Sequence, residues 1–309
     1  MLRHAGALAK VSLSLAFCAL SHPIEVFASI SANFDFAVPV MVSSKTTIEV
    51  QESIPVLKLK TQANQQMKFE MQGLGDVEDP TSSRLPADVR VTLKDLFMHL
   101  NVNGKELIFD PRGDKVSVPL NHLSQLIDRP LNLRIDPQGH LTDGTDTFAS
   151  IFRELPALKQ LSFQNILSDH LHHLFTLYGR ELMIGDTIQI QGAADSVIGP
   201  SPTMTYEIIA IDDDEIKAIV KGKLSPAVST FTIKGEAGAE PATVKMYLTG
   251  DVSGKASWNR RNALLSTLDK EYRYQAKMGM GDTEWMMLMT MNNVINVSPP
   301  AAAPKRYAK

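Results

Sequence analysis

EYRYQAKM, residues 271–278, is the stretch that decides the fold of this chain. Apolar side chains occupy every second position, and charged or polar ones lie between them: Tyr272, Tyr274, Ala276 and Met278 against Glu271, Arg273, Gln275 and Lys277. Successive side chains of a β-strand point to opposite faces of its sheet. The stretch therefore predicts a strand with one buried face and one exposed face.

The same period of two recurs from this stretch towards both ends of the chain. After a turn at Gly281-Asp282, the last strand is expected over Trp285–Met291. The apolar parity shifts near Lys94-Asp95, which indicates a β-bulge. Asn103-Gly104 then supplies the residues of a tight hairpin turn. Further strands are expected over residues 34–42, 67–71, 89–102, 188–190, 204–208, 216–220, 231–233 and 244–248.

Residues 145–178 change to a helical spacing. Apolar residues recur three and four apart from Phe148 to Leu155, where Pro156 interrupts them, and again from Ile166 to Tyr178. Gly179 follows as a typical C-terminal stop. This spacing predicts two helices.

Strands, then helices, then strands predict an α+β fold. We expect a mainly antiparallel, curved, half-barrel-like sheet in two β-rich halves, bridged by about two helices over residues 145–178. No Pro/Gly/Ser-rich linker separates the halves, so a single domain is expected over residues 29–297. The Pro- and Ala-rich residues 298–309 are predicted to be a disordered tail.

The N-terminus has the three parts of a secretory signal peptide. Arg3, His4 and Lys10 are basic, an apolar run follows over residues 11–20, and Val26-Phe27-Ala28 offers a cleavage site. The apolar run is shorter than the roughly 20 residues that a membrane span needs. We therefore expect residues 1–28 to be a signal peptide and the protein to be periplasmic or secreted.

Cys18 is the only cysteine, and it lies within this leader. A lipid anchor on Cys18 is the less favoured alternative, because Phe17 stands where lipoproteins carry a small residue. Cleavage after Ala28 would leave a mature chain without cysteine, so its fold would depend on its hydrophobic core and not on disulfides.

The composition is that of a globular protein, with 44% hydrophobic and 21% charged residues. The net charge of the whole chain is -3. No basic block occurs, which argues against a nucleic-acid partner. No second apolar stretch approaches membrane-spanning length, so we expect no transmembrane segment in the mature chain.

Methionines concentrate near the C-terminus and suggest one candidate site. Met287, Met289 and Met291 would project from one strand face roughly 7 Å apart, with Met278 and Met280 on the preceding strand. Thioethers are soft ligands that suit Cu(I). Methionine also fills irregular apolar space, and we favour a core or an apolar ligand-facing wall over copper.

Histidines and carboxylates suggest weaker candidates. His170 and His173 are three apart on the second predicted helix and could chelate a metal with His122, whereas His172 should point outward. The ordinary interpretation is a set of surface and boundary histidines. Asp212–Glu215 lacks the spacing of a calcium loop and predicts a solvated turn. Asp143 and Asp146 do not form an aspartic-protease motif.

Motifs for nucleophilic catalysis and for phosphate binding are absent from the sequence. We therefore assign no catalytic residue, no cofactor and no metal site, although an enzyme with a dispersed site stays open as an alternative.

Several segments follow one another in a recognisable order: Asn103-Gly104-Lys105-Glu106, Phe109-Asp110, residues 135–139, the helix ending near Tyr178, and residues 181–190, 206–221 and 247–258. This layout resembles a family of secreted bacterial proteins and lipoproteins of unknown function, over residues 45–297. The resemblance implies an envelope location and a β-rich fold, and it brings no catalytic residues. The chain departs from the lipoprotein members at Phe17. Its curved sheet would also look like the half-barrels of lipoprotein carriers.

These expectations lead to one function hypothesis and two alternatives. The first is non-enzymatic binding of an apolar small molecule or an envelope protein on a concave sheet, because Met, Phe and Leu side chains share the inner parity. The alternatives are copper binding through the C-terminal methionines and an enzyme with a dispersed site.

Overall fold

The structure is a computed structural model of the chain. It describes residues 28–29, 39–54, 57–74, 87–102, 104–113, 115–116, 124–136, 141–143, 163–177, 180–191, 202–233, 242–261, 263–280 and 282–299. Of these residues, 78% lie in strands and 6% in helix. The predicted α+β class is therefore wrong: the described part of the chain is an antiparallel β-sheet with one α-helix.

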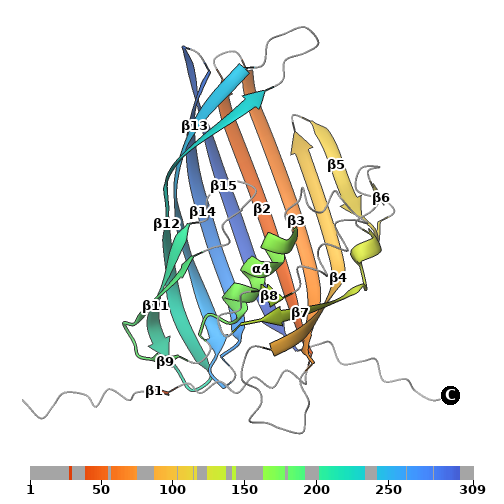
Figure 1. Ribbon diagram of the computed structural model, residues 1–309, viewed down its shortest axis with the longest axis vertical. Coiled ribbons are helices and arrows are strands. Elements are labelled where there is room, and N and C mark those ends of the chain that lie inside the picture. The colour runs from red at the N-terminus through yellow and green to blue at the C-terminus, as the bar shows by residue number, and fades with distance from the viewer. Residues whose placement is uncertain are drawn as a thin grey trace, which may run out of the picture.

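The main sheet has 13 strands, and its strand pairs are antiparallel. Its spatial order is β10 (Thr187–Gln191), β11 (Thr203–Ile211), β12 (Glu215–Ile233), β13 (Ala242–Asn259), β14 (Leu265–Met280), β15 (Thr283–Ser298), β2 (Val40–Ile54), β3 (Leu57–Gly73), β4 (Ala87–Val102), β5 (Lys105–Asp110) and β6 (Lys115–Val116). β7 (Pro130–Ile135) pairs with the N-terminal part of β4, and β8 (Leu141–Asp143) pairs with β7. β1 (Ala28–Ser29) and β9 (Glu181–Leu182) form a separate pair. Figure 1 shows that the main sheet is strongly curved.

The two β-rich halves form one continuous sheet, and in the part of the chain that the structure describes they are joined by strand pairing and not by helices. β15 pairs with β2 from Met286 opposite Ser53 to Ser298 opposite Met41. This pairing joins the last long strand to the first, so the backbone groups on both strand edges gain partners. The prediction of halves joined by helices is wrong because strand pairing between distant segments is not visible in local periodicity.

The alternation that predicted the strands decides which side chains are buried. On β14, Tyr272, Tyr274, Ala276 and Met278 are buried, whereas Arg273, Gln275 and Lys277 are exposed. The predicted bulge in β4 is confirmed: the register shifts so that Lys68 lies opposite Asp95 and Phe69 opposite Leu93. The predicted hairpin is also confirmed, with Val102 opposite Lys105 and Gly104 at φ 84°.

The helix α4 (Phe163–Leu174) lies inside the curve of the sheet, as Figure 1 shows. Leu167, Leu171 and Leu174 are buried and belong to the same core cluster as the inner face of the sheet. α4 corresponds to the second predicted helix. The first predicted helix, over residues 148–155, lies outside the described residues.

The ends of the chain are described only in small part. The predicted leader is described only at Ala28, which lies opposite Leu182 in the β1–β9 pair, and residues 300–309 lie outside the described residues. Within the part of the chain that the structure describes, no helix has the length and apolar character needed to cross a membrane.

Candidate functional site

The concave face of the sheet has two halves that differ in what covers them. In the half that we call the filled half, α4 packs against the sheet, and Phe69, Tyr206 and Leu268 are at most 1% exposed. In the half that we call the open half, six inner-face side chains are only half-buried: Ile48, Val50, Met246, Trp285, Met287 and Met291. In Figure 1, α4 lies towards the end of the sheet where β7, β8 and β9 are found.

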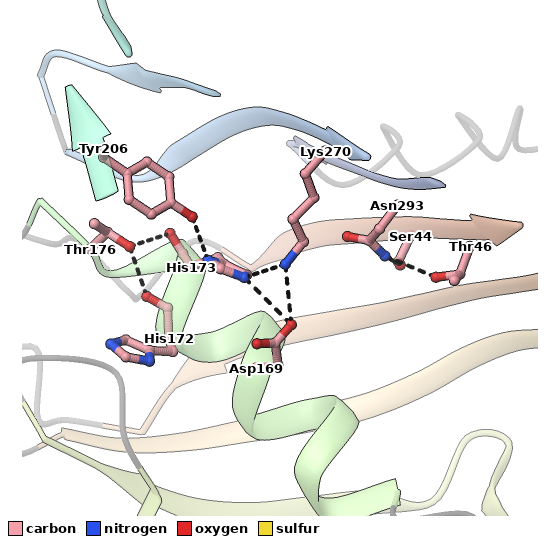
Figure 2. A network of polar contacts seen from close by, with 9 residues as sticks. All are labelled: Ser44, Thr46, Asp169, His172, His173, Thr176, Tyr206, Lys270 and Asn293. Atoms are coloured by element: carbon pink, nitrogen blue, oxygen red, sulfur yellow. Dashed lines mark hydrogen bonds and ion pairs between the residues drawn. The ribbon is translucent and has the colours of Figure 1, made fainter. Parts of the chain in front are cut away.

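A buried polar cluster joins α4 to the filled half. It consists of Asp169 and His173 on α4, Tyr206 on β11 and Lys270 on β14 (Figure 2). His173 Nδ1 lies 2.7 Å from Tyr206 Oη, and His173 Nε2 lies 2.5 Å from Lys270 Nζ. Asp169 Oδ2 is 3.4 Å from Lys270 Nζ and 3.4 Å from His173 Nε2. Three elements far apart in the sequence therefore meet at one imidazole ring.

The donors in this cluster fix the tautomer of His173. A lysine ammonium has hydrogen atoms to donate and no lone pair to accept with. Lys270 therefore donates to His173 Nε2 and to the carboxylate of Asp169. Since Nε2 accepts, the ring proton is on Nδ1, and Nδ1 donates to the hydroxyl oxygen of Tyr206. The geometry thus assigns a neutral imidazole to His173.

The electrostatics of the cluster agree with that assignment. Burial and the charge of Lys270 lower the pKa of His173, although Asp169 acts in the opposite direction. Burial alone would raise the pKa of Asp169, but the charge of Lys270 outweighs it and holds that pKa well below its ordinary value. Burial raises the pKa of Tyr206, so its hydroxyl stays protonated. At neutral pH the cluster therefore contains one negative charge, one positive charge and two neutral rings.

The backbone beneath Lys270 requires glycine on the neighbouring strand. Gly254 of β13 lies directly opposite Lys270. A Cβ atom at position 254 would lie 2.8 Å from Lys270 Cα, closer than real Cβ contacts come. Gly254 thus permits the close approach of β13 and β14 that fixes where the Lys270 side chain begins.

A second polar group lies directly beside the cluster. Asn293 of β15 is opposite Lys270 on one side and opposite Thr46 of β2 on the other. Its side-chain amide nitrogen donates to Thr46 Oγ1 at 2.9 Å and to Ser44 Oγ at 3.5 Å. We call Lys270, Asn293 and Thr46 the border row. The next inner-face level beyond this row, away from α4, contains the half-buried Ile48 and Met291 of the open half.

The small exposed fraction of the cluster residues argues against a catalytic role. Lys270 and His173 are each 1% exposed, and Tyr206 is 0% exposed. Of the four residues only Asp169, with 32% of its side chain exposed, reaches the surface. A substrate would have no access to the imidazole or the ammonium in this arrangement. The cluster therefore acts as an anchor that holds α4 in the curve of the sheet.

The histidines that offered the less favoured metal-binding alternative have other contacts in the structure. His170 packs edge-to-face on Phe69, with ring centroids 6.0 Å apart, and both ring nitrogens of His173 already have partners. His172 stacks on His173 at 6.5 Å and is half-buried. His122 lies outside the described residues. Among the described residues, no group of three or more His, Cys, Asp or Glu side chains is placed to hold a metal ion.

The C-terminal methionines share the inner face, as their parity predicted. Met289 is buried, and Met287 and Met291 are half-buried. The strands on both sides place Ala276, Tyr274 and Tyr272 opposite them on β14, and Glu52, Val50 and Ile48 on β2. None of the three therefore has another methionine directly opposite, and together they form an apolar strip of the open half.

The acidic candidate Asp212–Glu215 forms ion pairs at the surface. Asp212–Glu215 is the turn between β11 and β12, as predicted, and basic groups surround it. Lys217 lies 3.0 Å from Asp212, and Arg261 lies 3.2 Å from Asp214. Asp143 ends β8 opposite Arg134, and Asp146 lies outside the described residues.

Reasoning from the sequence missed Asp169 and Lys270. Lys270 did carry a signal: it stands between Leu268 and Tyr272, at the parity that is otherwise apolar in β14. A charged residue at an inner position needs a buried partner. Asp169 and His173 are four apart on α4, so one turn of helix presents both to Lys270.

Comparisons with known proteins identify no family. No family model matches the chain, and no curated protein matches it. Among solved structures, lipovitellin, in a structure of its lipid–protein interactions, is similar with a TM-score of 0.45 and 11% identity. That match covers 86% of this chain, which spans only 26% of the lipovitellin chain. An outer membrane channel from Pseudomonas putida F1 matches with a TM-score of 0.19 and 6% identity, over 90% of this chain and 99% of the channel.

Proposed function

We propose that the protein is a non-enzymatic binding protein whose open half holds an apolar small molecule. The observation that carries this proposal is the change in burial along the inner face. Side chains beneath α4 are almost completely buried, whereas Ile48, Met287 and Met291 on the same face are half-buried. An apolar surface that the described fold leaves partly uncovered is a typical place for an apolar ligand.

The arrangement of rigid and adaptable groups supports this proposal. The anchored α4 fills one end of the curve, so the ligand site expected on the concave sheet is limited to the open half. Three of the six open-half side chains are methionines, which are flexible and suit surfaces that adapt to apolar partners. The polar cluster offers no accessible nucleophile or base, so binding is favoured over catalysis.

The proposed location follows from the leader and not from the fold. We propose that residues 1–28 direct export and that the open half acts in the periplasm or outside the cell. Mass spectrometry of protein recovered from the periplasm tests this proposal. A mass that begins at Ser29 supports it, and an intact Met1 in the cytoplasm contradicts it.

The two tryptophans allow a direct test of apolar binding, because the chain has only Trp258 and Trp285. Trp258 is buried in the filled half, in contact with Tyr206 at 5.6 Å between ring centroids. Trp285 lies on the inner face of the open half. In the variant Trp258→Phe, titration with a long-chain amphiphile such as monolauroylglycerol should shift the emission of Trp285 to shorter wavelength and saturate.

A matched variant separates the two faces of β15. Met287→Gln should weaken this binding, whereas Leu288→Gln, on the outer face and 53% exposed in the native protein, should leave it unchanged. The absence of a saturable change at Trp285 with any apolar probe would contradict the proposed function.

A further inference from the structure

The amide oxygen of Asn293 is a buried acceptor without a donor. Asn293 is 7% exposed, and its amide nitrogen is held by Thr46 and Ser44, which fixes the orientation of the amide group. Its oxygen Oδ1 is buried and receives no hydrogen bond from the residues that the structure describes. Figure 2 shows this oxygen on the side of Lys270. A buried amide oxygen normally has a donor, so Asn293 offers an acceptor directly beside the polar cluster of α4.

Lys270 is the donor within reach of this oxygen. Lys270 and Asn293 are directly paired on β14 and β15, so their Cβ atoms are about 5 Å apart. Lys270 is 1% exposed, so the protein encloses its ammonium together with the amide of Asn293. A lysine ammonium sits on a flexible four-carbon stem. Rotation within that stem can turn the ammonium from α4 to Asn293 while the backbone stays in place.

The neutral ring of His173 holds the ammonium on the side of α4. Lys270 Nζ lies 2.5 Å from His173 Nε2 and 3.4 Å from Asp169 Oδ2. A proton on Nε2 would turn this acceptor into a donor, so two positively charged donors would face each other at a hydrogen-bond distance. The hydrogen bond from Lys270 to His173 is therefore incompatible with a protonated imidazole.

After protonation, each of the two cations has an acceptor within its own element. His173 Nε2 lies 3.4 Å from Asp169 Oδ2, one turn away on α4. The displaced ammonium of Lys270 has Asn293 Oδ1 on the neighbouring strand. The contact of His173 with Tyr206 persists, since Nδ1 keeps its proton. Protonation thus exchanges the polar contact between α4 and β14 for one contact within α4 and one within the sheet.

Titratable side chains surround His173 from three elements: Asp169, His170 and His172 on α4, Tyr206 on β11, and Lys270 and Tyr272 on β14. Asp169 stays ionised in mild acid, because the charge of Lys270 holds its pKa well below its ordinary value. Burial raises the pKa of both tyrosines, so their hydroxyls stay neutral. The two neighbouring histidines serve as controls, and the test has to resolve each histidine separately.

We propose that His173, Lys270 and Asn293 form a proton-driven switch, in which a proton on His173 turns Lys270 from α4 to Asn293 and loosens the helix from the concave face. This inference concerns the filled half and does not depend on what the open half binds. The pKa of His173 is lowered in the docked helix, so a released helix binds the proton more tightly. Acid therefore favours release below about pH 6.5, the ordinary pKa of histidine.

Nuclear magnetic resonance of the histidine ring nitrogens tests the switch directly, because each ring has its own signals. At pH 7 we expect a neutral His173 with its proton on Nδ1. Asn293→Leu removes the acceptor that Lys270 needs in the protonated state, so the pKa of His173 should fall by about one pH unit, a loss of about tenfold in proton affinity. Asn292→Leu, on the exposed outer face of the same strand, should leave that pKa unchanged. Thr46→Val releases the amide of Asn293 and should lower the pKa as well, and it is the variant to use where Asn293→Leu does not fold.

Hydrogen–deuterium exchange measures the loosening of α4. After correction for the pH dependence of the intrinsic exchange rate, the protection of the α4 amides should fall about tenfold between pH 7 and pH 5. The protection of β15 should change much less. His173→Gln should abolish the fall at α4, whereas His172→Gln should keep it.

The outcomes are separate from those of the proposed function. If neither Asn293→Leu nor Thr46→Val changes the pKa of His173, or if the protection of α4 is the same at both pH values, the switch is overturned. The proposed function stands or falls with the emission of Trp285, which reports on the open half.

Discussion

The filled half and the open half of the concave face share β14 and β15 and the same alternation, yet six inner-face side chains of the open half are only half-buried. β14 and β15 run through both halves. Leu268 and Ile295 at one end are 0% exposed, whereas Met287 and Met291 further along are half-buried. The difference comes from α4 and its anchor. Strand periodicity determines which face is apolar, and the element that lies across that face determines how deeply it is buried.

The largest expected effect comes from removing the anchor. Lys270→Met leaves the carboxylate of Asp169 without its main partner, so we expect the free energy of unfolding to fall by about 3 kcal/mol, measured by urea denaturation. Lys277→Met is the matched control, because Lys277 lies on the outer face of the same strand and pairs with Glu284 at the surface. That change should cost less than about 1 kcal/mol.

A double variant shows whether charge or packing causes the loss. Asp169→Leu combined with Lys270→Met removes both charges, so it should recover much of the stability that the single variant loses. Equal losses in the single and the double variant would show that the ion pair does not hold α4.

Truncating one apolar side chain in each half should give unequal losses. Leu171→Ala on α4 removes a fully buried side chain, and we expect a loss of about 3 kcal/mol. Met291→Ala removes a half-buried side chain, and a loss of about 1 kcal/mol is expected. Urea denaturation of both variants under one set of conditions measures the difference, and equal losses would show that the open half is packed as tightly as the filled half.

Acid should weaken the filled half through His173. The folded pKa of His173 is lowered, so below about pH 6.5, its ordinary value, the unfolded chain binds a proton that the folded chain does not. Stability should therefore fall as the pH falls, by at most about 1.4 kcal/mol per pH unit from this residue. The lowered pKa of Asp169 acts in the same direction below about pH 3.9.

Two adjacent histidines test the source of this pH dependence. Urea denaturation at pH 7 and at pH 5 should show a smaller difference in His173→Gln than in the native protein. His172→Gln, at the half-buried neighbouring position, should keep the native difference. A full pH effect in His173→Gln would assign it to other groups.

The smallest effect is spectroscopic and leaves stability unchanged. Acrylamide should quench Trp285 in the variant Trp258→Phe more strongly than it quenches Trp258 in the variant Trp285→Phe, because Trp258 is 0% exposed and Trp285 is half-buried. Saturating monolauroylglycerol should reduce the quenching of Trp285 alone. Equal quenching of the two tryptophans would remove the distinction between the halves.

The candidate site was predictable only in its apolar part. The parity of Met287, Met289 and Met291 placed them on the inner face, because side-chain direction in a strand depends only on position along it. The anchor was not predictable, since Asp169 and Lys270 are 101 residues apart in the chain. In the sequence, nothing distinguishes Asn293 from its neighbour Asn292. Only the strand register shows that Asn293 lies opposite Lys270 and Thr46.

The sequence by itself determined the strands, the bulge in β4, the hairpin at Gly104 and the helix over most of α4, because short-range geometry and periodicity govern these features. Only the tertiary structure decided that β15 pairs with β2, that α4 lies inside the curve, and that one half of the concave face is filled. Those features depend on which distant strands pair with each other and which buried charges form ion pairs. An unpaired strand edge or a buried ammonium finds no partner within its own segment, so its partner is set by the tertiary structure.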